Sequence, residues 1–153
     1  MPGTPIETVQ EFLANSTDPA TVNRLVAPDA TYVSLNFDNP ELKKVMPWTG
    51  TSTGPENFVF TFSNVARFWT IEAFEITDIF GAEDKVAVFG SFTYRSVTQG
   101  IAVTSPFSIL AKVTDGKITY FQFMEDTFAT ARSFRSDGTW TIQSDPDSAS
   151  FEV

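Results

Sequence analysis

The stretch DGKITYFQFMEDT, residues 115–127, decides the fold class of this chain. It begins with a turn signal, because Asp and Gly favour the backbone angles of a tight turn. The run from Lys117 to Glu125 is rich in β-branched and aromatic side chains, which is typical of a strand. Asp126 then begins a short helical segment, 126–134, and occupies the position of a helix N-cap. A strand that follows a tight turn predicts an antiparallel neighbour.

Three segments upstream have the same strand character. They are rich in Val, Ile, Phe, Tyr and Thr, and turn signals at 81–84 and 99–100 separate them. Such short turns again predict antiparallel neighbours. Pro106 interrupts the third segment, which indicates an edge position or a bulge there. The predicted strands cover residues 70–80, 86–97 and 102–113.

The first half of the chain predicts helices at three places. Thr4-Pro5-Ile6-Glu7 is a capping box with proline at the first helical position. Asp18-Pro19 begins a second helix in the same way, and Gly54-Pro55-Glu56 begins a third. The third helix carries a wide apolar stripe, which on an amphipathic helix is typical of core. Its members are Phe58, Phe62, Val65, Ala66 and Trp69.

Two other segments lie between the predicted helices. Residues 30–36 predict a short strand, and residues 37–53 predict a long loop because they are rich in proline and glycine. Helices followed by an antiparallel meander predict an α+β fold with the helices on one face of the sheet. We expect one domain over residues 1–135 and a polar tail, 136–153, that adds one strand or is disordered.

The composition excludes several classes of function. With 42% hydrophobic residues and 16 Phe, the chain is too apolar to be disordered. A formal net charge of −9 makes nucleic acid and anionic membranes unfavourable partners. Cysteine and histidine are absent, so we expect no disulfide, no histidine base, no metal site and no cofactor. No signal peptide and no membrane-spanning run is found, so we expect a cytoplasmic protein.

Three motifs in this order resemble the SnoaL-like, ketosteroid isomerase-like superfamily, also called nuclear transport factor two-like. LVAPDATY at 25–32 resembles the start of its first strand, PWTGTSTGPE at 47–56 its run into the third helix, and residues 115–127 its ending. The resemblance covers roughly residues 5–134. It implies a cystatin-like cone, in which three N-terminal helices pack on a curved antiparallel sheet around an apolar pocket. Such a fold does not fix a function.

The resemblance also implies where the catalytic groups of related enzymes would stand. Ketosteroid isomerases use a carboxylate base, a tyrosine and a protonated aspartate, and these positions fall on Ser34, near Gln10 and near Ile109. Limonene epoxide hydrolases use an arginine and two aspartates, whose positions fall on Gly90, Phe92 and Phe123. Tyr32 matches a tyrosine that positions water in those hydrolases. The usual catalytic acids of the family are therefore missing here.

Alternation along the strands assigns the side chains that face the interior. The predicted pocket lining is aromatic with a few hydroxyls, as ligand sites often are, although the same rings would also fill the cone as core. It consists of Tyr32, Ser34, Trp48, Phe92, Tyr94, Phe107, Ile109, Phe121 and Phe123. Glu125 has the same parity as Phe121 and Phe123, so it is the remaining candidate for a catalytic acid.

Three functions stay open at this point. The missing acids favour a non-catalytic domain that binds a small hydrophobic molecule in the aromatic pocket. The alternative is an isomerase, polyketide cyclase or epoxide hydrolase-like enzyme in which Glu125 acts with Tyr32, Tyr94 or Ser34. The third is a dimerisation or interaction module, and a homodimer is compatible with all three. The predicted outer face mixes apolar and polar side chains, namely Phe89, Thr93, Arg95, Ser108, Leu110, Tyr120, Gln122 and Met124.

Overall fold

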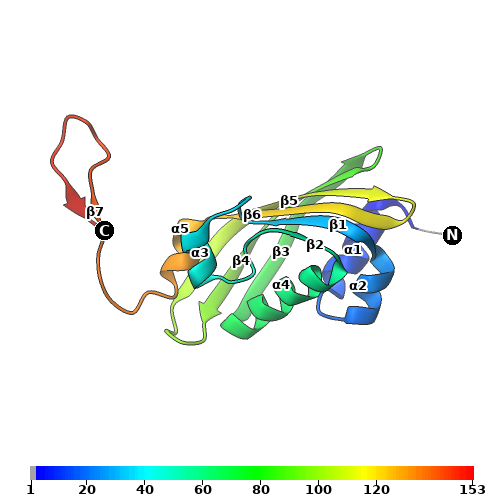
Figure 1. The fold of residues 1–153 in the computed structure, drawn as a ribbon, viewed down its shortest axis with the longest axis horizontal. Coiled ribbons are helices and arrows are strands. Elements are labelled where there is room, and N and C mark those ends of the chain that lie inside the picture. Colours follow the sequence, from blue (N-terminus) through cyan, green and yellow to red (C-terminus); the bar gives the residue numbers. More distant parts are fainter. Residues whose placement is uncertain (1–2) are drawn as a thin grey trace.

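The computed structural model describes residues 3–153 and confirms the α+β prediction (Figure 1). Its helices are α1 (Pro5–Ala14), α2 (Pro19–Leu25), α3 (Pro40–Val45), α4 (Pro55–Phe68) and α5 (Thr127–Arg132). Its strands are β1 (Val26–Ser34), β2 (Gly50–Thr53), β3 (Trp69–Ala82), β4 (Lys85–Ser96), β5 (Ala102–Thr114), β6 (Lys117–Glu125), β7 (Thr141–Ile142) and β8 (Phe151–Glu152).

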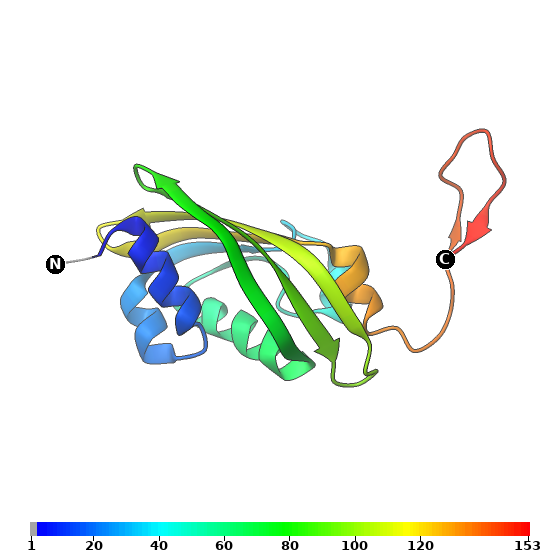
Figure 2. The ribbon, with the colours of Figure 1, turned by 180° about the vertical axis from the view of Figure 1, so that it is seen from behind.

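The main sheet is curved and has six strands in the order β2-β1-β6-β5-β4-β3. Helices α1 and α2 cover one end of its concave side, α4 lies along that side, and α3 and α5 lie at the opposite end (Figures 1 and 2). Neighbouring strands are antiparallel except for β1 and β6, which pair in parallel with Tyr32 beside Phe121 and Ser34 beside Phe123. This non-local pairing closes the cone.

The predicted starts of the first two helices are confirmed by their side-chain caps, while α4 begins at Pro55 after Gly54 without one. The Thr4 hydroxyl accepts a hydrogen bond from the backbone N–H of Glu7 at 3.2 Å, and the Glu7 carboxylate accepts one from the Thr4 N–H at 2.9 Å. Asp18 caps α2 through the N–H of Thr21 at 3.3 Å. These bonds pair backbone donors that the first helical turn leaves free.

The prediction of a continuous loop over residues 37–53 is wrong, because the segment contains α3 and β2. The Asn39 side chain accepts a hydrogen bond from the Leu42 N–H at 3.1 Å, and Pro40 occupies the first helical position. This is the same start signal as in α1 and α2, followed here by only six helical residues. The first strand also begins earlier than predicted, at Val26.

Pro106 lies at a local edge of the sheet, as its chemistry requires. β5 pairs with β4 on one side over its whole length, but its pairing with β6 begins only at Phe107, opposite Glu125. Pro106 therefore faces β4 alone and leaves no ladder hydrogen bond unmade. The predicted edge position is confirmed.

Gly90 in β4 makes room for the ring of Phe107. A Cβ atom at Gly90 would lie 2.7 Å from Cε1 of that ring and would also overlap the carbonyl oxygen of Glu75. The absence of a side chain thus allows the edge of the ring to approach the backbone of β4. In related epoxide hydrolases the resemblance places an arginine at this position, and the packed ring leaves no space for one.

The tail after α5 forms a hairpin of its own, with β7 paired to β8, and it projects away from the main sheet (Figure 1).

The longest helix, α4, has 14 residues. No helix within residues 3–153 combines the length and the hydropathy that a bilayer crossing requires.

Replacing Gly90 by alanine is expected to destabilise the fold by at least about 1–3 kcal/mol, because the added methyl group would overlap the backbone carbonyl oxygen of Glu75 and the ring of Phe107. Urea unfolding of G90A against wild type measures the change. The matched control is Ser91→Ala on the outer face of the same strand, which should stay within about 0.5 kcal/mol of wild type. Equal stability of G90A and S91A would contradict the packing described above.

Candidate functional site

Glu125 is the last residue of β6 and faces the interior of the cone. Phe107 lies opposite it on β5, and Phe123 precedes it with the same parity. The next residue, Asp126, has a structural role. Its carboxylate caps α5 by accepting a hydrogen bond from the Ala129 N–H at 3.1 Å. The predicted capping role of Asp126 is confirmed, which leaves Glu125 as the carboxylate available for chemistry.

The carboxylate of Glu125 is held in an apolar environment. Its Oε2 atom is fully enclosed and has no hydrogen-bond partner within residues 3–153. Burial raises the pKa of Glu125 to about 7, and the nearby Thr130 hydroxyl and the charge of Asp126 act in opposite directions on it. At neutral pH the group is therefore close to half ionised, so it can both accept and donate a proton.

Two buried tyrosines share the electrostatic field of this carboxylate. Burial raises the pKa of Tyr32 well above its ordinary value, and the negative charge of Glu125 raises it further. The pKa of Tyr94 is raised by the same two causes. The Ser34 hydroxyl acts in the opposite direction and lowers the pKa of Tyr32. Both phenols therefore stay protonated at neutral pH and can serve as hydrogen-bond donors.

Asn36 adds a further unpaired group at this end of the sheet. Asn36 lies two residues beyond the end of β1, after Leu35, whose φ of 68° is in the left-handed region. The side-chain oxygen and nitrogen of Asn36 are both buried without a partner within residues 3–153. Unpaired buried polar groups are rare and costly, so they indicate a place where a polar ligand completes the hydrogen bonding. The predicted pocket lining omitted Asn36, although strand alternation gives it the parity of Ser34.

Stacked aromatic rings form the wall beside this polar cluster. The rings of Phe107 and Phe123 lie 5.2 Å apart and nearly parallel, and Phe74 stacks on Phe107 at 4.7 Å. Phe92 stacks on Tyr94 at 3.9 Å. Phe74 is 39% exposed, so the stack reaches the molecular surface. Parallel rings of this kind favour flat, unsaturated molecules.

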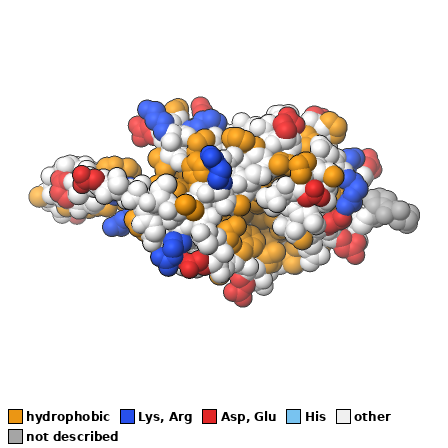
Figure 3. Space-filling view, turned by 90° about the horizontal axis from the view of Figure 1, so that it is seen from below, with side chains coloured by type: hydrophobic (Ala, Val, Ile, Leu, Met, Phe, Trp, Pro, Cys, Tyr) orange, Lys and Arg blue, Asp and Glu red, His pale blue; other side chains and the backbone are white. Residues whose placement is uncertain are grey.

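An apolar recess lies on the underside of the molecule (Figure 3). The register with β4 places Ile71, Phe74 and Ile76 on the concave side of the edge strand β3, and all three are exposed. Phe74 is thus exposed on one side and stacked on buried Phe107 on the other. The recess lies where the stack meets solvent.

Other residues of the predicted lining pack elsewhere in the interior. Phe121 lies edge-on to Phe12 at 5.2 Å, within the core that α1 and α4 cover. Ile109 is buried in the same core. Trp48 contacts Phe68 and Trp69 edge-on at 4.9 and 5.5 Å and closes the core at the end of α4. The polar cluster consists of Tyr32, Ser34, Asn36, Tyr94 and Glu125.

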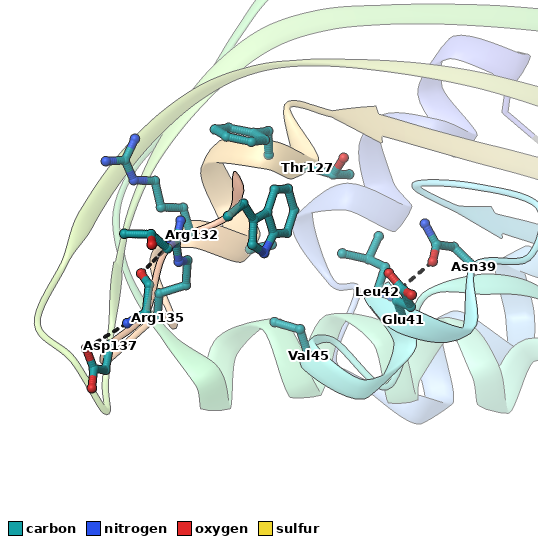
Figure 4. A pocket seen from close by; sticks show the side chains of 13 residues that line it. Asn39, Glu41, Leu42, Val45, Thr127, Arg132, Arg135 and Asp137 are labelled. Atoms are coloured by element: carbon teal, nitrogen blue, oxygen red, sulfur yellow. Dashed lines mark hydrogen bonds between the residues drawn. The ribbon is translucent and has the colours of Figure 1, made fainter. Parts of the chain in front are cut away.

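A separate groove of about 530 Å³ lies outside the cone (Figure 4). One wall is α3, and the other is α5 with the first residues of the tail. None of its lining residues belongs to the polar cluster.

The comparison with known sequences places this geometry in a family. A sequence model of the SnoaL-like domain matches residues 9–121. "Patulin synthesis protein F" of Aspergillus clavatus is 45% identical over 140 residues, which cover 88% of this chain and 71% of the relative. "Patulin biosynthesis cluster protein F" of Penicillium expansum is 43% identical over 144 residues, which cover 91% of this chain and 72% of the relative.

Solved structures share the fold at low identity. An NTF2-like protein of Burkholderia thailandensis superposes with a TM-score of 0.72 at 22% identity, over 87% of this chain and 98% of its own. TerC, co-crystallised with polyporic acid, superposes with a TM-score of 0.68 at 22% identity, over 84% of this chain and 97% of its own. At this identity the likeness concerns the fold alone.

Replacing Glu125 by glutamine is expected to change stability in a pH-dependent way. Because the pKa of Glu125 is raised from 4.5 to about 7 on folding, the folded state binds the proton more tightly than the unfolded state. Wild type therefore loses stability relative to E125Q as the pH rises through this window, by roughly 3 kcal/mol in total. Urea unfolding at pH 4, 6 and 8 measures the difference.

The control is Glu83→Gln in the exposed turn between β3 and β4, which should leave unfolding unchanged at all three pH values. A gap between E125Q and wild type that is the same at pH 4 and pH 8 would show that Glu125 is not held in an apolar environment.

Proposed function

The chain belongs to the SnoaL-like domain family, and on that premise we propose that it is an acid–base enzyme that moves protons on a small oxygenated ring compound. The observation that carries the proposal is Glu125, a buried carboxyl group with a pKa of about 7 whose charge raises the pKa of two buried tyrosines, Tyr32 and Tyr94. Perturbed acids of this kind cluster at catalytic sites.

The proposed reaction is a proton transfer next to a carbonyl group. Ionised Glu125 takes a proton from a carbon beside the carbonyl, and the electron pair of the broken C–H bond moves onto the carbonyl oxygen. The hydroxyls of Tyr32 and Tyr94 donate hydrogen bonds to this oxygen as it becomes negative. Glu125 then returns the proton to another ring atom, so the carboxylate is regenerated and no outside reactant is consumed. The product is an isomer of the substrate.

The relatives support a secondary-metabolite pathway as the setting. Two proteins at 45% and 43% identity bear names that place them in patulin biosynthesis. TerC, which shares the fold, was co-crystallised with polyporic acid, so a protein with this fold accompanies a small organic acid there. The stacked faces of Phe107 and Phe123 suit a flat ring.

Catalysis explains more of the site than binding alone. The missing family acids favoured a passive apolar pocket, and the buried rings of Phe92, Phe107 and Phe123 suit one. A purely apolar pocket gains nothing from an enclosed carboxyl group or from the unpaired amide of Asn36, because each of them costs free energy of folding. A reaction that uses these groups accounts for that cost.

The substrate is expected to accumulate when the gene is deleted in the source organism. Mass spectrometry identifies that metabolite, and the purified protein should then convert it to an isomer of the same mass in which one hydrogen has moved to another ring atom, as seen by NMR. E125Q should lower kcat by about 10²-fold or more. Y32F and Y94F should each lower it by roughly 10²-fold. The wild-type rate should rise as the pH increases through about 7, because the ionised carboxylate starts the reaction.

Ser91→Ala, on the outer face of β4, is the control and should keep the wild-type rate. A product whose mass differs from that of the substrate, or full activity of E125Q, would refute the proposed reaction.

We also propose that the chain forms a homodimer through the outer face of the sheet. This face combines exposed Leu110 and Phe89 with half-buried Tyr120, Gln122 and Met124, and the Lys112 ammonium lies over the Tyr120 ring at 5.0 Å. Charged side chains such as Arg95 lie toward its rim, where they pair with neighbours such as Glu72. A face that combines apolar side chains with polar groups toward its rim is typical of a protein–protein interface.

Leu110→Glu is expected to shift the protein from dimer to monomer in sedimentation velocity at micromolar concentration, because it buries a charge in the interface. Val97→Glu, in the exposed turn between β4 and β5, changes the same charge outside this face and should leave the dimer intact. A wild-type protein that sediments as a monomer would rule the dimer out.

A further inference from the structure

The groove between α3 and α5 has the size of a small-molecule site. Its volume of about 530 Å³ lies within the range of roughly 300–1,000 Å³ that ligand pockets occupy. Leu42 and Val45 of α3 form an apolar wall, and α5 faces them with Phe128 and Ala131 (Figure 4). Sites of this kind are apolar surfaces with a few polar groups that orient the ligand.

An exposed aromatic pair lines the tail side of the groove. Phe128 is 51% exposed, Trp140 is 58% exposed, and their rings meet edge-on with centroids 5.9 Å apart. Trp140 lies at the base of the tail hairpin, where its backbone N–H and carbonyl exchange hydrogen bonds with Val153 at 2.7 and 2.9 Å. Its indole lines the groove. Large aromatic side chains held open to solvent in this way are typical of binding surfaces.

The charged groups of the groove are placed to orient an anion. Arg135 donates a hydrogen bond to the Gly138 carbonyl at 2.6 Å, and the Asp137 carboxylate accepts one from the Gly138 N–H at 2.7 Å. These two residues hold the turn that leads into the hairpin. Arg132 on α5 is exposed, and the salt bridges within residues 3–153 do not include it. Glu41 stands on the opposite wall.

We propose that this groove is an outer binding site for an aromatic carboxylate, with the ring against Trp140 and Phe128 and the carboxylate on Arg132. A guanidinium binds a carboxylate through two parallel hydrogen bonds. The negative charge of Glu41 disfavours the reverse orientation, in which the carboxylate would face α3. The site is independent of the proposed reaction, because it shares no residue with the polar cluster around Glu125.

Trp140 reports on this site directly. The other tryptophans, Trp48 and Trp69, are only 5% and 2% exposed, so a ligand in the groove should change the emission of Trp140 alone. The probe is biphenyl-4-carboxylate, titrated into the full chain with excitation at 300 nm and checked by isothermal titration calorimetry. A saturable change in emission is expected, and Trp140→Phe should abolish it. The neutral biphenyl-4-carboxamide tests the charge.

Variants separate the parts of the proposal. Arg132→Gln should weaken binding of the carboxylate probe about tenfold and leave binding of the amide probe unchanged, because it removes only a charge-assisted contact. Arg132→Lys should weaken it less. Phe80→Ala removes an exposed ring of β3 and should have no effect, and Glu125→Gln should bind the probe like wild type. The proposal fails if the emission change persists in W140F, if R132Q binds the carboxylate as tightly as wild type, or if the amide binds equally well.

Discussion

The ring of Phe107 lies against the bare backbone of Gly90, and this contact fixes how the rest of the interior is arranged. With that ring in place, Phe74 and Phe123 both stack on it, so aromatic side chains occupy the space beside Gly90. A charged side chain at the middle of β4 would have to displace the stack. The polar groups of the site are consequently found at the end of β6, where the rings stop.

The position of the polar groups at the end of β6 also explains the raised pKa of Glu125. Buried carboxylates are normally paired with a cation or bound by several donors. Here the adjoining donors are used structurally, since the Ala129 N–H binds Asp126 and the Asp126 N–H binds the Ser105 hydroxyl. Glu125 is left against Phe107 and Phe123 with one oxygen unpaired, and burial raises its pKa to about 7. The same packing that excludes the family's usual acids thus creates a different one.

How much of this was predictable depends on how local each signal is. The capping box at Thr4–Glu7 and the alternation from Lys117 to Glu125 are local, so the sequence predicted those helices and strands and the parity of Glu125. The β1–β6 pairing joins residues about 90 positions apart, and no local pattern specifies it. The enclosure of Glu125 depends on Phe107 and Thr130, which come from other elements. The groove lined by Leu42 and Trp140 unites three segments that no motif connects.

The solved structures and the sequence relatives give different kinds of information about this chain. Solved structures with TM-scores near 0.7 and identities near 22% share the cone, and the cone alone is compatible with isomerases, hydrolases and passive binding proteins. Relatives above 40% identity indicate a biosynthetic setting but not a reaction. The reaction class is inferred from the site, because only an acid near neutrality beside protonated phenols distinguishes proton transfer from storage of a ligand. The proposed reaction therefore rests on Glu125, and the fold explains only why this residue lies at the end of β6.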